Sequence, residues 1–234
     1  MDTICPRIVS EGKMRNPDPP GERERALRIE LSKRTISIPS RTERDERIDR
    51  DSPEIREIGG AINTLIREER LEEARARLDE ALVQYPDEPG LLNLRVVLDI
   101  MDKPFGDYRQ ARKNCETALE TAVNKDNVFY TCHILNNMAL IAHKEGHEEF
   151  SKAMYLAAHF IDRTAFPPLI NLAAWNSRKS QLEEAMEWID RILETFPDWR
   201  ENEEIVTFFR KDESLANLRS YGPFKMKVLS KIGS

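Results

Sequence analysis

The chain lacks the features that mark several classes of protein. No apolar run approaches the roughly 18 residues that a membrane-spanning helix needs. The three cysteines are too few for a disulfide framework. Residues 1–14 lack the apolar stretch of a secretory signal peptide. We therefore expect a cytoplasmic protein with no membrane span.

Aromatic residues are missing from the first part of the chain. The sequence has 3 Trp, 5 Tyr and 9 Phe, and the first of them is Tyr85. Within residues 1–52, 23 residues are charged and five are proline. Such a composition cannot bury enough apolar surface to offset the entropy lost on ordering. Residues 1–52 are therefore predicted to be a mostly disordered charged tail.

The residue patterns of common active sites are also missing. The chain has no phosphate-binding glycine loop, no nucleophile elbow, no zinc-protease helix motif and no C-x-x-C. His143 and His147 are four residues apart, but Gly146 between them predicts a turn. Cys115 and Cys132 fall at apolar helical positions, which favours buried, inert thiols. We expect no enzyme activity, no catalytic residue, no metal and no cofactor.

Neither sign of charge dominates the chain. The formal net charge is −6, with 36 Lys and Arg against 42 Asp and Glu. A protein that neutralises many phosphates would carry a clear basic excess. Binding of nucleic acid is therefore not expected.

From Ser52 onward the sequence reads as consecutive helices. Ser52 is placed to cap a helix that has Pro53 at its first position. Helix-breaking residues such as proline and glycine then recur between helical stretches of about 12 to 17 residues. The alternation of apolar and polar residues that is typical of strands is absent. Gly59-Gly60 is too short to hold a phosphate and is interpreted as allowing close helix packing.

An internal repeat organises these helices. Residues 71–74 and 182–185 are both Leu-Glu-Glu-Ala, 111 residues apart. Apolar residues follow each alanine four and seven positions later, and an aromatic residue and proline end each copy. Two weaker copies lie between them, so that the key small residues are Ala74, Ala111, Ser151 and Ala185.

This spacing resembles the tetratricopeptide repeat, a helix-turn-helix unit of about 34 residues. The resemblance implies four units at roughly 55–88, 92–125, 132–165 and 166–199, with an insertion of about three residues at Lys103-Pro104-Phe105. The predicted fold is an all-α solenoid in residues 53–200, closed by C-terminal capping helices in residues 201–234. Another helix is predicted over residues 202–210 within that cap.

In this family, residues of each first helix line a concave groove. The resemblance implies a lining made of Arg56, Asn63, Arg67, His133, Asn136, Asn137, His143, Lys144, Asn171, Ser177 and Arg178. Because the register of the second unit is uncertain, it contributes no residue to this set. The set contains cations and no carboxylate, which favours an acidic partner segment. The resemblance further implies that Asn137 and Asn171, both at position 6, hold a peptide backbone.

Three functions follow from this interpretation. The first is a non-enzymatic adaptor that binds an extended or helical, acidic partner segment in the groove. The second is a structural protein that assembles with copies of itself. The third, less favoured because of the charge balance, is an RNA-binding helical repeat. The partner-binding residues predicted are Asn63, Arg67, His133, Asn136, Asn137, Lys144, Asn171 and Arg178.

Overall fold

The computed structural model of the protein describes residues 51–102 and 108–232. These residues form eleven α-helices and three short 3-10 helices, and no strand occurs among them. The fold is therefore all-α, as the sequence predicts. The predictions for residues 1–50 and for the insertion at Lys103-Pro104-Phe105 lie outside the described residues.

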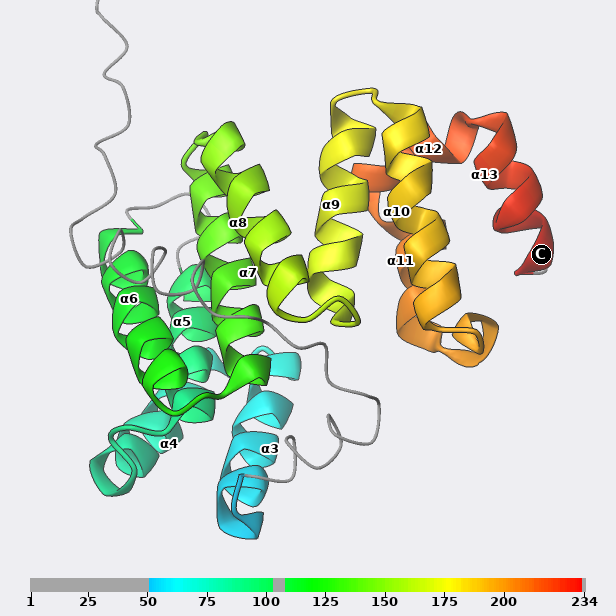
Figure 1. Cartoon of the computed structure of the whole chain (residues 1–234). Helices are drawn as coiled ribbons and strands as arrows, with labels where there is room; N and C mark the ends of the chain where they lie inside the picture. Colours follow the sequence, from blue (N-terminus) through cyan, green and yellow to red (C-terminus); the bar gives the residue numbers. More distant parts are fainter. Residues whose placement is uncertain (1–50, 103–107, 233–234) are drawn as a thin grey trace, which may run out of the picture. The chain divides into compact units, whose positions relative to one another are not determined.

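The first eight helices form four antiparallel pairs (Figure 1). Their bounds are α3 Pro53–Arg67 and α4 Leu71–Gln84, α5 Pro89–Asp102 and α6 Arg109–Asn124, α7 Val128–Lys144 and α8 Glu148–Ile161, α9 Phe166–Arg178 and α10 Leu182–Thr195. The Ser52 side chain accepts a hydrogen bond from the Ile55 amide, and Pro53 occupies the first turn of α3. The predicted start of the first helix is thus confirmed.

One kind of turn recurs along the chain. Glu69, Gly146 and Ser180 lie between the two helices of the first, third and fourth pairs, with φ of 59°, 80° and 59°. In each turn the next residue donates its amide to a carbonyl five residues back, as in Arg70 to Leu65 at 2.9 Å. This left-handed helix ending satisfies carbonyls that the helix leaves open. The same backbone geometry therefore repeats although the residue types differ.

The repeat pattern read from the sequence is buried throughout. The small residues that begin the pattern, Ala74, Ala111, Ser151 and Ala185, are at most 2% exposed. The residues four and seven positions later are also buried, namely Leu78, Ala81, Cys115, Ala118, Tyr155, Ala158, Ile189 and Ile192. Small residues here let the two helices of a pair approach each other, and the larger ones fill the space between neighbours.

Consecutive pairs contact each other in two ways. Each second helix packs on the first helix of the following pair, as α4 does on α5, α6 on α7 and α8 on α9. The first helices also contact one another in chain order, from α3 to α5, α7 and α9. We call α3, α5, α7 and α9 together the first-helix layer. Every residue predicted to bind a partner belongs to this layer.

The segment after the fourth pair covers that pair. It comprises α11 Glu203–Lys211, α12 Ala216–Ser220 and α13 Gly222–Lys227, with short 3-10 helices at Trp199–Glu201, Glu213–Leu215 and Leu229–Lys231. Phe209, Leu215 and Phe224 are fully buried against residues of α9 and α10. The helix predicted over residues 202–210 is confirmed, with Asn202 as its cap. The fold thus ends in a cap built of several short elements.

The interpretation of Gly59-Gly60 as a close-packing site is wrong. A Cβ atom on Gly60 would meet nothing within 4 Å, and one on Gly59 would reach only Leu94 Cδ1 at 4.0 Å. The close approach occurs at Gly90, where a Cβ atom would lie 2.5 Å from the Tyr130 hydroxyl oxygen. Gly90 therefore allows α5 and α7 to meet at their N-terminal ends.

Candidate functional site

Two equivalent amide hydrogen bonds join neighbouring helices of the first-helix layer. Asn137 Nδ2 on α7 donates to Asn93 Oδ1 on α5 at 2.9 Å. Asn171 Nδ2 on α9 donates to Asn136 Oδ1 on α7, also at 2.9 Å. Each bond fixes a carboxamide in one orientation and leaves a second N–H and an oxygen lone pair for other contacts.

These bonds settle the register of the second unit. Asn171 and Asn137 hold position 6 of their units, and Asn136 holds position 5. For the two bonds to be equivalent, Asn93 must also hold position 5, so the first helix of the second unit counts from residue 89 instead of 92. The three-residue shift equals the insertion that the sequence predicts.

Between the first and second units, the residues at positions 5 and 6 are also neighbours, but neither is an asparagine and no hydrogen bond joins their side chains. Position 5 of the first unit is Gly59 and position 6 of the second is Leu94, and these are the neighbours found at 4.0 Å. The row of asparagines therefore runs from α5 to α9 and stops before α3. Asn63 lies on α3 outside this row, and its side chain is exposed.

A second row lies at position 13, in the last turn of each first helix. Arg67, Lys144 and Arg178 hold this position in the first, third and fourth units, and Met101 holds it in the second. All four side chains are exposed. None of the three cations pairs with a carboxylate of the described chain. This position-13 row thus combines three available positive charges with one apolar side chain.

Two histidines of the layer are neutral at pH 7. Burial lowers the pKa of His143, and the nearby charge of Arg178 lowers it further, against the opposing effect of Glu148. Burial also lowers the pKa of His133, whose ring lies 4.3 Å from that of Phe129. The positive charge of this surface therefore comes from Lys144 and the arginines.

Two residues of the predicted lining are not available to a partner. Asn136 is 7% exposed and its oxygen is occupied by Asn171. Ser177 is fully buried. Both lie where α7 and α9 face neighbouring helices, which disfavours the predicted contact with a partner. Asn93, which the uncertain register excluded, and the exposed Met101 replace them in the layer.

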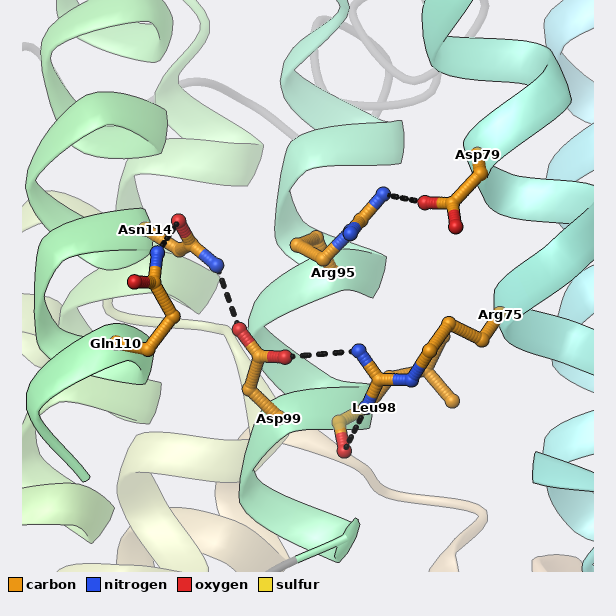
Figure 2. A network of polar contacts seen from close by, with 7 residues as sticks. All are labelled: Arg75, Asp79, Arg95, Leu98, Asp99, Gln110 and Asn114. Atoms are coloured by element: carbon orange, nitrogen blue, oxygen red, sulfur yellow. Dashed lines mark hydrogen bonds and ion pairs between the residues drawn. The ribbon is translucent and has the colours of Figure 1, made fainter. Parts of the chain in front are cut away.

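A different polar cluster, not recognised in the sequence, lies where α4, α5 and α6 meet. Figure 2 shows Asp99 accepting from Arg75 Nη1 at 3.1 Å and from Asn114 Nδ2 at 2.6 Å. Arg95 pairs with Asp79 in the same view. Every charge drawn there has an opposite partner, so this cluster connects the first two pairs, and Arg95 Nε is its buried nitrogen without a hydrogen-bond partner. The sequence feature that could have indicated this cluster is the presence of oppositely charged residues on two consecutive helices, namely Arg75 and Asp79 on α4 and Arg95 and Asp99 on α5.

The described part of the chain gives little support for a metal site, a reactive thiol or a membrane-spanning helix. Residues 51–102 and 108–232 contain no group of three His, Cys, Asp or Glu residues that could hold a metal ion. Cys115 and Cys132 are buried, and burial raises the pKa of both thiols, which disfavours the reactive thiolate. None of the described helices combines the length and the apolar character needed to cross a bilayer.

Comparisons with known proteins identify no relative. No protein-family model matches the chain, and neither a curated protein nor a solved structure gives a significant match. The described residues therefore establish an all-α fold of repeated helix pairs, and membership of the tetratricopeptide repeat family stays a prediction.

Proposed function

We propose that the protein is a non-enzymatic scaffold that binds an acidic segment of a partner protein on its first-helix layer. The observation that carries the proposal is the position-13 row, in which Arg67, Lys144 and Arg178 are exposed at equivalent places and form no ion pair with an acidic residue of the described part of the chain. A cation in the last turn also interacts favourably with its own helix dipole. That effect accounts for a cation at one helix end, but it does not explain why none of the three pairs with a carboxylate of the described residues when the chain has a net charge of −6.

The asparagine row supports an extended partner in particular. The carboxamides of Asn137 and Asn171 are held by bonds to the preceding first helix. Their remaining N–H and oxygen groups can bond to a peptide backbone without losing further side-chain entropy. Carboxylates of the same segment would then lie along the position-13 row, with an apolar side chain near Met101.

The direct test is charge reversal with a matched control. The test variant is Arg67→Glu/Lys144→Glu/Arg178→Glu, and the control is Arg77→Glu/Lys113→Glu/Lys211→Glu. The control cations are exposed, lie outside the first-helix layer and lack ion pairs within the described residues, and Lys211 also ends a helix. Both variants change the net charge equally.

Each variant is used to capture partners from a lysate of the organism that encodes the protein. We expect a partner that wild type and control retain and that the test variant loses by about tenfold or more. Equal capture by all three proteins contradicts the proposal. Recovery of the protein's own copies alone, with a mass above the monomer by light scattering, favours the self-assembling alternative.

A further inference from the structure

A second surface of the molecule presents two arginines on aromatic rings. Arg191 on α10 has its guanidinium carbon 4.4 Å from the centroid of the Trp188 ring. Arg163, just after α8, lies 5.8 Å from the ring of Phe160. His159 lies between these two arginine–ring pairs, with its ring centroid 6.1 Å from that of Phe160 and 5.1 Å from that of Trp188. We call these five residues the arginine–aromatic patch.

The Arg191 side chain is held in place by its neighbours. Its Nη1 atom donates to His159 Nε2 at 3.3 Å, and its guanidinium stacks on Trp188. His159 is 5% exposed, and burial together with the two arginines lowers its pKa to about 4. The imidazole is therefore neutral at pH 7 and accepts from Arg191. An exposed guanidinium fixed in this way loses little entropy when it binds an anion.

Among the described residues, no carboxylate forms an ion pair with Arg163 or Arg191, although the charge of Asp162 acts on the neighbouring His159. Glu187 and Glu194 lie four residues before and three after Arg191, which is a favourable spacing for ion pairs on a helix. Neither forms one with Arg191. Asp162 is buried, and its Oδ1 accepts from the amide and the hydroxyl of Thr164 at 2.9 and 2.6 Å. Both exposed arginines thus lack an ion pair within residues 51–102 and 108–232.

An exposed aromatic ring completes the patch. Phe160 is 55% exposed, whereas Phe166 and Phe196 of the neighbouring pair pack against the core. Arginine and large aromatic residues are the types that contribute most to binding at protein interfaces.

We propose that the arginine–aromatic patch is a second docking site, for a protein segment that carries a carboxylate next to an aromatic or aliphatic side chain. The carboxylate accepts from Arg163 and Arg191, and the apolar side chain covers Phe160. The site lies on α8 and α10, the second helices of their pairs, so it does not depend on the first-helix layer.

The test uses the full chain and three synthetic peptides of equal length. The first alternates Glu and Phe in a Gly-Ser background, the second has Gln in place of Glu, and the third has Ala in place of Phe. Binding is followed by fluorescence anisotropy for wild type, Arg163→Gln/Arg191→Gln, Phe160→Ala and Arg67→Glu/Lys144→Glu/Arg178→Glu. Arg77→Gln/Lys113→Gln is the matched control, and circular dichroism checks that each variant is folded.

We expect the Glu-Phe peptide to bind wild type and the control with the same affinity within about twofold. Loss of both arginines or of Phe160 should weaken binding by about tenfold, as should either change in the peptide. Equal binding by all variants, or no saturable binding to wild type, overturns the proposal. If binding is lost only in the Arg67→Glu/Lys144→Glu/Arg178→Glu variant, the peptide binds the first-helix layer, which overturns this patch and supports the function proposed above.

Discussion

At the scale of single residues, Gly90 carries the tightest packing constraint among the described glycines. Its missing side chain admits the Tyr130 hydroxyl, which donates to Asp51 Oδ2 at 2.7 Å. This bond connects Asp51, which lies just before the Ser52 cap of α3, to α7, 79 positions later. Gly90→Ala should therefore push the tyrosine away and lower the free energy of unfolding by about 1–2 kcal/mol.

The double mutant Gly90→Ala/Tyr130→Ala distinguishes the steric clash with Tyr130 from the effect of alanine on helix propensity. In a Tyr130→Ala background the space beside residue 90 is free, and alanine is the better helix former by roughly 0.5–1 kcal/mol. The same substitution should then be neutral or stabilising in urea unfolding. An equal loss of stability in both backgrounds would show that contact with the Tyr130 side chain is not the reason for glycine at position 90.

His159 predicts a pH dependence of stability. Its pKa is about 4 in the folded protein, whereas an unfolded histidine titrates near 6.5. The unfolded state takes up its proton first as the pH falls. The free energy of unfolding should thus decrease between about pH 6.5 and pH 4, by about 2–3 kcal/mol from this group.

His159→Gln keeps an acceptor for Arg191 but removes the titration. The variant should lose a large part of the stability change that wild type shows between pH 7 and pH 4.5 in urea unfolding. His133 and His143 also have lowered pKa values, so some slope should remain. An unchanged slope in the variant would show that His159 does not titrate as described.

The single residues of the candidate site were only partly predictable. Asn137 and Asn171 are found at equivalent positions, as the spacing indicates. Their bonds to Asn93 and Asn136 were not foreseen, because side-chain pairing between units depends on how the first helices cross. The exposure of Arg67, Lys144 and Arg178 could be predicted, because the repeat spacing places each of them at the end of a first helix.

At the scale of helices and turns, the recurring left-handed residue gives a stability prediction. Glu69 and Gly146 occupy the same place in two turns, but only glycine adopts this conformation without strain. Glu69→Gly should raise the free energy of unfolding by about 0.5–1 kcal/mol, and Gly146→Ala should lower it by about 1 kcal/mol.

Gly222→Ala is the matched control for these substitutions. Gly222 has open space around its Cβ position and no positive φ, so alanine there should not destabilise. Thermal unfolding of the three variants distinguishes conformational strain from a general effect of glycine content. A destabilised Glu69→Gly variant would contradict the account of the turn.

Most elements could be predicted because burial in this fold follows a strict spacing. The small and large residues of each second helix alternate at intervals of four and three, and the structure buries all of them. The register of the first helix of the second pair was harder to predict, because the spacing between the second and third units departs from that of the others. The two hydrogen bonds between asparagines supply a register that the sequence left open.

At the scale of the whole molecule, apolar clusters and polar contacts together hold neighbouring pairs. One apolar cluster joins residues of α3, α4 and α5, and another joins residues from α9 to α13. Polar bonds connect first helices and leave cations exposed on that layer. A repeat array stabilised through neighbour contacts can expose such a layer without losing its core.

The central claim is that a partner lies on the first-helix layer, and site-specific photocrosslinking tests it most directly. A photoreactive phenylalanine is placed at Met101 in that layer and, as a control, at Val83 on α4, both exposed apolar positions at 40% and 83%. The account predicts that position 101 crosslinks to an acidic segment of the partner and that position 83 does not. Crosslinks from position 83 alone, or none from either position in a complex that still forms, would contradict it.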